Sequence, residues 1–574
     1  MKSFRILRLP LLALLHLART EQAGGVVHDS TWTPDYVLEA TAQTITLDCR
    51  QRHSVVVNSS SPGPTLYLTE NKTTWVRVHN RMPDQNFTVH WHGLTQRVAP
   101  FSDGTPLVSQ WPIAPGAFFD YELRPDAVTA HGALIVREQG SPPYEYDEEL
   151  IVGLGDFFQK NDSTVVQGLL ADPFQWSGEP DALLFQRLER DSGIRQQDGR
   201  RLLPAQRGDG QAGQDVPVTL GIEGHQNLTV IEAEGHYTQP AMTDHVQLGS
   251  GQRFSVLLQT RTEDDIAARS GKTQFWIRFE SRDRPKTIVG YALLQYDMSD
   301  SQAVSYQTPL PQELPATSPV VLPTETSSWL EYTLQPLDSE EAARFPRLPE
   351  VTRTVYITMA QQLNSLAWQE SALADDTGYV PLLVRLYVTG ETPDYGAARA
   401  NQDWDPETKA FPALVGETLD IVWLSNSGPT GGWDAHPMHM HGERYWDLGL
   451  GNGTYDAAAN EAARFGGGYT PARRDTTMLY RYAAKGGVHM TAGWRAWRVR
   501  VTEESVGAWV LHYHVLMHMV MGMQTVWVFG NTSQILTRFP QQPYIAGYLD
   551  FGGSVYGNGT SDPVVWETFS QDGR

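Results

Sequence analysis

The chain contains 574 residues, carries a formal net charge of −22 at pH 7 and has a single cysteine, Cys49. This length exceeds what one hydrophobic core normally supports, so the sequence predicts several domains. Its acidity argues against charge-driven binding to nucleic acid or to an anionic membrane, and one cysteine excludes an intrachain disulfide.

Residues 1–23 have the pattern of a secretory signal peptide. Three basic residues, Lys2, Arg5 and Arg8, precede an apolar run at residues 9–18, which is too short to span a bilayer. An uncleaved anchor is the alternative, and we expect no membrane span elsewhere in the chain. Asn-x-Ser/Thr sequons favour a secreted glycoprotein; they lie at Asn58, Asn71, Asn86, Asn161, Asn227, Asn452, Asn531 and Asn558.

Short β-rich runs between Gly, Pro and Asn residues dominate the rest of the chain. In chain order they are TTWVRVHN, FTVHWHG, RFSVLLQT, QFWIRFE, LDIVWLSN, AWRVRV and AWVLHYHV. Helical periodicity is scarce, and residues 452–465 are the best helix candidate. Many short strands in a chain of this length predict tandem β-sandwiches.

Two stretches do not follow the strand pattern. Residues 308–326 are rich in Pro, Ser and Thr and indicate a linker. Residues 185–215 are rich in Arg, Gln and Gly without a usable period, which leaves a loop, a disordered insert or misassigned coding sequence as alternatives. The predicted organisation is a signal peptide (1–23), a first domain (24–140), a second domain (141–305), a linker (306–349) and a third domain (350–574).

Histidines cluster at three places in the sequence. The clusters are HWHG with His90 and His92, HPMHMHG with His436, His439 and His441, and HYHVLMHMVMGM with His512, His514 and His518. Residues i and i+2 of a strand point to one face, so each cluster contains a His-x-His pair on one face. One pair alone is usually a surface or satisfied core feature, but three pairs predict a nitrogen-lined pocket for more than one metal ion, because imidazole suits copper, zinc and iron.

The residue between the last pair, Tyr513, faces the opposite side of its strand. We expect His436, His518 and Met523 on that side. Two imidazoles and a thioether are most of a mononuclear blue-copper site, whose missing member is a cysteine thiolate. The position at which a blue-copper site has the cysteine sulfur is therefore occupied by the phenol of Tyr513.

These motifs resemble those of the multicopper oxidases, especially the fungal laccase and ascorbate-oxidase-like branch. The resemblance covers almost the whole mature chain and rests on HWHGLTQ, DGTPLVSQWPIAPG, GALIVRE, IEAEGHYTQP, GSGQRFSVLL, HPMHMHGERYWDLG and HYHVLMHMVMGM. It implies an all-β fold of three tandem cupredoxin-like Greek-key sandwiches. It also implies a mononuclear copper in the third sandwich that takes electrons from a phenol-like donor, and a trinuclear cluster between the first and third that reduces O2 to water.

The resemblance implies a role for each candidate ligand. The type 2 copper would be held by His90 and His439, one type 3 copper by His92 and His514, the other type 3 copper by His441 and His512, and the type 1 copper by His436 and His518 with Met523 axial. Asp103 matches an acid that relays protons during O2 reduction. Glu234 matches an acid that receives a proton from the phenolic donor, and an exposed loop carboxylate is its alternative.

The sequence departs from the family twice. Tyr513 stands where the family has the copper-binding cysteine that also carries electrons between the copper sites, and a neutral phenol with an ordinary pKa near 10 is a poor ligand. A further His-x-His pair is absent before HGALIVRE, where the chain runs YELRPDAVTAHGALIVRE. His131 is no obvious substitute, because related sequences carry a histidine there as well as the pair. Each type 3 copper thus lacks one histidine, and we expect fewer than four coppers per chain.

A degenerate copy and a gene-model error both explain the missing pair, but an error of splicing does not easily explain Tyr513. The predicted activity is one-electron oxidation of phenolic donors coupled to reduction of O2, plausibly in fungal secondary metabolism. The alternative is a catalytically impaired copper-binding pseudo-oxidase or accessory protein. Acidic residues around His436 and His518 would favour a ferroxidase instead.

Overall fold

The computed structural model describes residues 33–538 apart from residues 107, 111, 126–129, 132–133, 172, 191–199, 208–216, 269–270, 285, 297–310, 325, 328, 360–385, 387–391, 429–430 and 484–485. The predicted signal peptide and the sequon at Asn558 lie outside this part of the chain. Among the described residues, no helix is long and apolar enough to cross a membrane.

The first sandwich is built from residues 36–137. One sheet has the order β2-β1-β4-β5, and the other has the order β3-β7-β6. Inward side chains of both sheets, including Val76, Tyr121 and Leu68, share one core. The strands are β1 (Tyr36–Leu47), β2 (Arg50–Val57), β3 (Leu66–Thr69), β4 (Thr74–Asn80), β5 (Phe118–Leu123), β6 (Ala130–His131) and β7 (Leu134–Arg137).

The second sandwich pairs a sheet of order β13-β12-β15-β10-β8-β9 with one of order β14-β11-β16-β17. Its core includes Val230 and Phe254 of the first sheet and Phe279 of the second. The elements are β8 (Glu148–Phe157), α2 (Asp162–Leu169), β9 (Ala182–Arg190), β10 (Arg200–Arg207), β11 (Val218–Ile222), β12 (Leu228–Ala233), β13 (His236–Thr243), β14 (Val246–Leu248), β15 (Arg253–Gln259), α3 (Glu263–Ala268), β16 (Gln274–Ser281) and β17 (Val289–Gln295).

The irregular stretch at residues 185–215 contains two strands that the sequence pattern did not reveal. β9 pairs antiparallel with β8, and β10 pairs with both β8 and β15. The backbone ladder defines these strands, and period-2 hydrophobicity does not. The described part of this stretch therefore belongs to the second sandwich.

The third sandwich carries the two later histidine clusters. Its sheets have the orders β18-β20-β25-β22-β23 and β19-β27-β26-β21-β24, and a core with Trp423, Trp497 and Trp527 lies between them. The strands are β18 (Arg353–Met359), β19 (Phe411–Ala413), β20 (Thr418–Asn426), β21 (His436–Met440), β22 (Tyr445–Asn452), β23 (Arg473–Arg474), β24 (Thr476–Leu479), β25 (Thr491–Arg500), β26 (Gly507–Tyr513) and β27 (Gln524–Phe529).

The third sandwich also contains short helices. They are α7 (Tyr395–Ala400), α8 (Ala457–Asn460), the π-helical turn η4 (Glu461–Phe465), η5 (Glu503–Ser505), α9 (Leu516–Val520) and α10 (Thr532–Arg538). The predicted helix at residues 452–465 is thus confirmed over its second half. Asp456 caps it, because its carboxylate accepts a hydrogen bond from the backbone amide of Ala459.

The described part of the predicted linker packs against the sandwiches. It contains η2 (Leu330–Thr333), α4 (Ser339–Ala343) and η3 (Leu348–Glu350). Trp329 enters the core of the second sandwich, and the buried carboxylate of Glu331 accepts a hydrogen bond from Arg495 of β25 at 3.0 Å. This segment therefore connects the second and third sandwiches through buried contacts.

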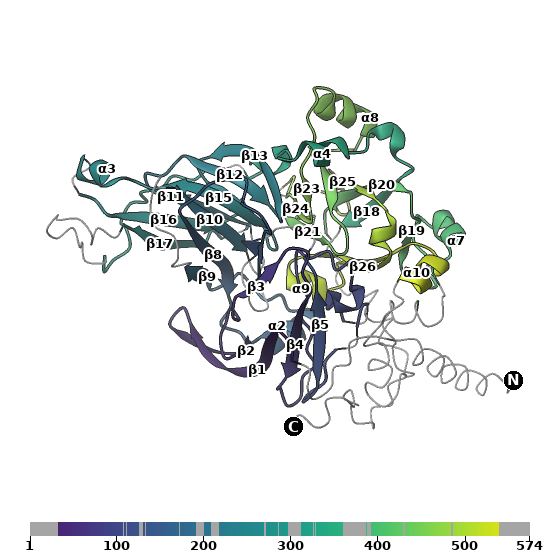
Figure 1. The fold of residues 1–574 in the computed structure, drawn as a ribbon, viewed down its shortest axis with the longest axis horizontal. Helices are drawn as coiled ribbons and strands as arrows, with labels where there is room; N and C mark the ends of the chain where they lie inside the picture. The colour runs from purple at the N-terminus through teal and green to yellow at the C-terminus, as the bar shows by residue number, and fades with distance from the viewer. Residues whose placement is uncertain are drawn as a thin grey trace.

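The three sandwiches lie around a common centre (Figure 1), with the second at left, the third at upper right and the first below. Buried ion pairs join them: Arg97 of the first sandwich bonds Glu443 of the third, and Arg474 of the third bonds Glu234 of the second. The prediction of an all-β fold of three tandem sandwiches is confirmed. β21 and β26, which carry the histidines, face this centre.

Candidate metal centre

Two neighbouring strands of the third sandwich position four of the histidines. β21 and β26 are antiparallel, and their register places His439 directly opposite His512. Directly opposed residues on one face of a sheet bring their side chains together. His441 and His514 follow at the ends of the same strands, so their side chains extend the row on that face.

The first sandwich contributes the other two histidines from the irregular segment after β4. His92 Nδ1 lies 2.9 Å from His514 Nε2. The ring of His90 stacks on that of His441 with centroids 3.8 Å apart. The two pairs that the resemblance assigns to the type 3 coppers are therefore in contact, since His441 Nε2 also lies 3.0 Å from His512 Nε2.

Hydrogen bonds to one ring nitrogen fix the tautomer of the neighbouring imidazoles. His439 Nδ1 lies 2.9 Å from the backbone oxygen of Asp475, and His512 Nδ1 lies 3.0 Å from that of Tyr513. His90 Nδ1 lies 2.7 Å from the backbone oxygen of Asp103. A carbonyl only accepts, so each Nδ1 must donate, and each Nε2 carries the lone pair.

Asp103 fixes the tautomer of His441 in the same way. This carboxylate is fully buried at the end of a 3-10 turn, η1 (Pro100–Asp103), and lies 2.9 Å from His441 Nδ1. The Thr105 hydroxyl donates to it at 2.7 Å. Burial alone would raise the pKa of Asp103, but hydrogen bonds from His441 and Thr105 help to hold it well below its usual range, so it is an ionised acceptor.

Because these hydrogen bonds engage the Nδ1 atoms, the Nε2 lone pairs of the histidines face one another. His441 Nε2 and His512 Nε2, both lone-pair nitrogens, lie 3.0 Å apart, and ligand nitrogens of His90, His439 and His441 all lie within 4.8 Å of one another. His439 Nε2 is buried without a hydrogen-bond partner among the described residues. A buried acceptor without a donor is costly, and a bound cation supplies what these atoms lack.

Burial also keeps these imidazoles in the protonation state that binds metal. Desolvation lowers the pKa of His439 to about 3 and lowers the pKa of His512 well below its ordinary value. Only a neutral imidazole coordinates a metal ion, and nitrogen ligands of this type suit copper. The donor set of His90, His439, His441 and His512 therefore fits copper.

The opposite face of β26 holds the pocket that the resemblance assigns to the type 1 copper. The Tyr513 ring contacts both His436 and His518, with centroids 4.8 Å and 4.7 Å away. Strand alternation predicts this orientation, away from His512 and His514. The Tyr513 side chain is fully buried, and its hydroxyl donates to the backbone oxygen of Ala435 at 2.7 Å.

This pocket does not fit a blue copper ion. The phenol ring packs against both imidazoles, whose own centroids lie 6.2 Å apart, and its hydroxyl donates its proton to the backbone oxygen of Ala435. A type 1 site needs a thiolate, two imidazoles and a distant thioether. Met523 contributes its amide and carbonyl to the turn beside His518 and packs partly buried against the core, but a sulfur ligand at the Tyr513 position is missing.

Comparison with known proteins gives the family. Three sequence profiles, each described as multicopper oxidase, match residues 39–133, 148–299 and 381–533. The chain belongs to the multicopper oxidase family. The prediction of a laccase-like member is confirmed, because the chain is 49% identical over 97% of its length to multicopper oxidase aurL2 of Gibberella zeae, covering 98% of that protein. It is 38% identical over 99% of its length to laccase-like multicopper oxidase 1 of Thermothelomyces thermophilus, covering 97% of it.

Solved structures agree with the fold of this multicopper oxidase. Fet3p, a multicopper oxidase that functions in iron import, superposes with a TM-score of 0.60 at 20% identity, covering 90% of this chain and 94% of its own. The laccase from Botrytis aclada superposes with a TM-score of 0.56 at 21% identity, covering 87% of this chain and 88% of its own. These likenesses concern the fold alone.

The acidic groups near the type 1 position of this oxidase are paired. Burial lowers the pKa of His436 and of His518, and the nearby carboxylate of Asp434 opposes this shift. Arg284 binds Asp434 at 3.1 Å and Glu179 at 2.8 Å. One guanidinium compensates only one of the two negative charges, so acidic character remains near His436 and His518, which is the feature that would favour a ferroxidase.

Glu234, the predicted acceptor of a substrate proton, lies in a buried ion pair. Its side chain is fully buried, and Arg474 Nη2 donates to its Oε1 at 2.8 Å. Burial raises the pKa of Glu234, against the opposing charge of Arg474. Its position joins the second and third sandwiches, and its role toward a substrate stays a prediction.

Two polar residues at the centre escaped the sequence analysis. Asp475 precedes β24, accepts bonds from Arg253 at 2.6 Å and 2.5 Å, and approaches His439 Nδ1 at 3.5 Å. Arg253 begins β15 and reaches His92. Neither residue stands at a sequence spacing typical of metal ligands, although ligand atoms of Asp475, His92 and His439 lie within 4.8 Å of one another in the structure. The signal that could have pointed to them is the presence of charged residues at the ends of otherwise apolar strands.

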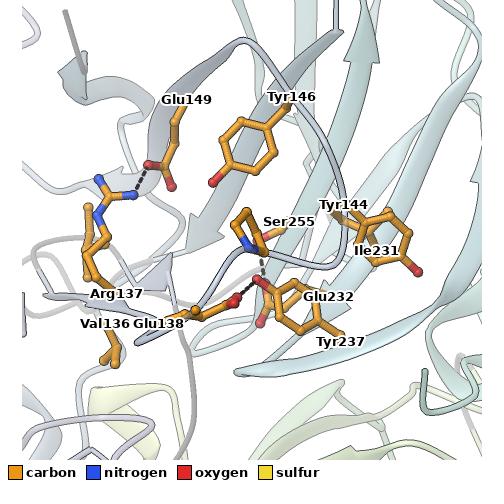
Figure 2. Close-up of a pocket in the computed structure, with 13 residues that line it drawn as sticks. Val136, Arg137, Glu138, Tyr144, Tyr146, Glu149, Ile231, Glu232, Tyr237 and Ser255 are labelled. Atoms are coloured by element: carbon orange, nitrogen blue, oxygen red, sulfur yellow. Dashed lines mark hydrogen bonds and ion pairs between the residues drawn. The ribbon is translucent and has the colours of Figure 1, made fainter. Parts of the chain in front are cut away.

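A separate cavity of about 160 Å³ lies between the first and second sandwiches (Figure 2). Tyr144, Tyr146 and Tyr237 line it together with three glutamates. The glutamates are engaged: Glu138 accepts from Tyr237, Glu149 from Arg137, and Glu232 from Ser255. The three glutamates that line the cavity are therefore all hydrogen-bonded or ion-paired, and none of the predicted histidines lines it.

Proposed function

We propose that this chain is a copper-dependent oxidase that reduces O2 to water with electrons from small phenolic donors, and that Tyr513 makes electron delivery slow. The observation that carries the proposal is the set of Nε2 lone pairs on His90, His439, His441 and His512, which face one another in a buried centre. Copper bound by these nitrogens would supply one-electron redox chemistry and reduction of O2.

The residues around the centre orient the ligands and hold protons. Asp103 keeps His441 in the tautomer that presents Nε2. Its Oδ2 accepts from Thr105 and from His441, whereas its Oδ1 is buried without a hydrogen-bond partner among the described residues and is the oxygen that would take up a proton during O2 reduction. The backbone oxygens of Asp475 and Tyr513 fix His439 and His512 and keep the ring positions constant.

Tyr513 interrupts the route by which the donor's electrons reach this centre. The chain still links His518 to the centre, since Tyr513 stacks on His518 and its backbone oxygen accepts from His512. A thiolate would couple strongly to copper, whereas a neutral phenol does not. We therefore expect a colourless type 1 pocket and negligible turnover of simple phenols.

Metal analysis of the copper-loaded protein tests the proposal. The wild type should retain copper, but fewer than four ions per chain, and His441→Gln should lower the copper content. His225→Gln is a matched control, because His225 is buried in the second sandwich and bonds Tyr296. Complete absence of copper after reconstitution, or four tightly bound ions per chain, would contradict the proposal.

The exposure of the sequon asparagines supports secretion and glycosylation of the protein. The seven described sequon asparagines are all exposed, as attachment of a bulky glycan requires. We place the enzyme outside the cell, where fungal secondary metabolism would supply phenolic donors. A mass decrease after treatment of the secreted protein with an endoglycosidase would support this, and an unchanged mass would count against it.

The second candidate is a copper-binding accessory protein without turnover. Tyr513 favours it, because a phenol packs against His436 and His518 at the position of the thiolate. Oxygen uptake separates the two candidates: any phenol-dependent uptake that is lost in His441→Gln supports the oxidase, whereas copper binding with no uptake supports the accessory protein.

A further inference from the structure

The imidazole of His518 is buried while both of its ring nitrogens lack a partner. The residue is 1% exposed, and neither Nδ1 nor Nε2 has a hydrogen-bond partner among the described residues. His436 lies beside it, with ring centroids 6.2 Å apart, and its Nδ1 is likewise buried without a partner in that part of the chain. Buried polar atoms without partners are costly. Three such nitrogens in one pocket therefore indicate that a ligand binds there.

The groups next to these imidazoles are uncharged. The Tyr513 hydroxyl is directed away from them, because it donates to the backbone oxygen of Ala435 at 2.7 Å. Met523 is held beside both rings by its backbone: its amide donates to the His518 oxygen, and its oxygen accepts from the Tyr513 amide. Burial lowers the pKa of both imidazoles, so they are neutral at pH 7. The pocket thus offers two neutral imidazoles and one thioether.

The ionised groups nearest the pocket carry one net negative charge. Arg284 binds Asp434 at 3.1 Å and Glu179 at 2.8 Å, so one guanidinium faces two carboxylates. The three side chains are at most 22% exposed, and solvent therefore screens them only partly. A bound ion of charge +1 balances this trio. A divalent ion would leave an excess positive charge in a buried site, which is unfavourable.

Two aromatic rings cover His518. The Tyr513 ring lies 4.7 Å from its centroid and the Trp176 ring 5.2 Å, at interplanar angles of 23° and 30°. These rings leave the edges of the imidazole as its places of ligand contact, and they keep water from its faces. A pocket that excludes water disfavours the more highly charged state of a bound ion.

We propose that His436, His518 and Met523 bind one copper ion that stays in the monovalent Cu(I) state. Thioether ligands favour Cu(I). The anionic thiolate of a blue-copper site would offset the second charge of Cu(II), whereas the neutral phenol of Tyr513 does not. Such an ion is colourless and does not pass electrons onward. The inference rests on the proposed function only in taking copper as the metal, and it gives a physical reason for slow electron delivery.

X-ray absorption at the copper edge tests the inference on the full-length protein, because it distinguishes Cu(I) from Cu(II). Protein loaded with Cu(I) without oxygen and then exposed to air should retain about one Cu(I) ion per chain, and His518→Phe should contain about one fewer. Met517→Leu is the matched control, because Met517 is buried next to His518 in sequence but its sulfur accepts from the Ser177 hydroxyl at 2.8 Å. This variant should keep the ion.

Two results would overturn the inference: a wild type without Cu(I) after exposure to air, or an unchanged Cu(I) content in His518→Phe. The fate of the proposed function is read separately, from the copper that His441→Gln loses. Cu(I) in the His518 pocket without copper in the histidine centre would support the inference and contradict the proposed function. Copper in the centre without Cu(I) in the pocket would overturn the inference alone.

Silver binding provides a second measurement, because Ag(I) is a soft monovalent ion that air does not oxidise. In calorimetric titrations of the metal-free protein, Met523→Leu should bind Ag(I) more weakly than the wild type, and Met517→Leu should bind it equally well. This comparison also decides the question if His518→Phe does not fold. Equal Ag(I) affinity of Met523→Leu and the wild type would contradict the assignment of Met523 as a ligand.

Discussion

At the scale of single residues, strand alternation predicted which histidines share a face and which way Tyr513 points. It could not predict the partners of the second ring nitrogens. The acceptors that fix His439 and His441 come from Asp475 and Asp103, which are far from them in sequence. The hydrogen-bond partner of each ring nitrogen, which only the structure provides, was needed to distinguish nitrogens that carry a lone pair from nitrogens that donate a proton.

The pocket around Tyr513 should make the stability of the protein depend on pH. Burial lowers the pKa of His518 to about 3, from an ordinary 6.5. Between these values the unfolded chain binds the proton and the folded chain does not, so stability falls as the pH falls. At pH 5 the loss is about 2 kcal/mol from this residue. Urea denaturation of the metal-free protein at pH 7 and pH 5 measures it.

His518→Phe is the control for this pH effect, because phenylalanine can stack on Tyr513 without titrating. The variant should lose about 2 kcal/mol less between pH 7 and pH 5 than the wild type. An identical pH dependence in the two proteins would show that His518 is not the titrating group.

Asp103 should contribute to copper affinity through His441. Asp103→Ala removes the acceptor that holds His441 Nδ1, and loss of such a partner typically costs about 10- to 100-fold in metal affinity. Competition with a copper chelator measures the change. Asp447→Asn is the control, since Asp447 is buried but bonds Arg495. Equal affinity of Asp103→Ala and the wild type would count against the assigned role.

At the scale of elements, the β-rich runs in the sequence located β20, β25 and β26 of the third sandwich. They missed β9 and β10, because their pairing with β8 and β15 is a property of the backbone ladder. The predicted linker at residues 306–349 is not simply a spacer, because its described part buries Trp329 and Glu331. Composition indicates where regular structure stops, but not whether the chain then packs.

The turn that carries Asp103 should tolerate no side chain at Gly104. This glycine has a φ of +79°, and a Cβ there would lie 1.8 Å from the backbone oxygen of Val89. Gly116 has a φ of +80° but open space around it. Gly116→Ala should cost about 1 kcal/mol from backbone strain alone, and Gly104→Ala clearly more, as measured by denaturant midpoints. Similar losses would contradict the packing described for η1.

At the scale of the whole molecule, three large cores and buried ion pairs between sandwiches hold the fold. Cys49 is free and exposed, so no disulfide within the chain contributes. We therefore expect the melting temperature of the purified monomer to change by less than about 1 °C when a reductant is added. A large fall would show that covalent cross-links matter after all.

The spatial order of the sandwiches also explains why the site could be predicted in part. Two histidine clusters lie on one sheet of the third sandwich, and the remaining cluster comes from the first sandwich. The histidine motifs occur along the chain in the order typical of the family, and this order was sufficient to predict that the histidines meet. The contacts of Arg253 with Asp475 and His92 were not predicted, because Arg253 comes from the second sandwich. The absent His-x-His pair precedes β7, in a stretch of which residues 126–129 and 132–133 lie outside the described part of the chain.

The central claim is that this multicopper oxidase keeps a copper-binding histidine centre while Tyr513 closes the route of electrons into it. The most direct measurement compares visible absorption and phenol-dependent oxygen uptake of the copper-loaded wild type with those of Tyr513→Cys. We predict that the wild type is colourless in the blue-copper region with negligible uptake, and that Tyr513→Cys gains blue absorbance, with full oxygen uptake only when the missing His-x-His segment is also rebuilt. Strong oxygen-consuming phenol oxidation by the unmodified chain would contradict the account.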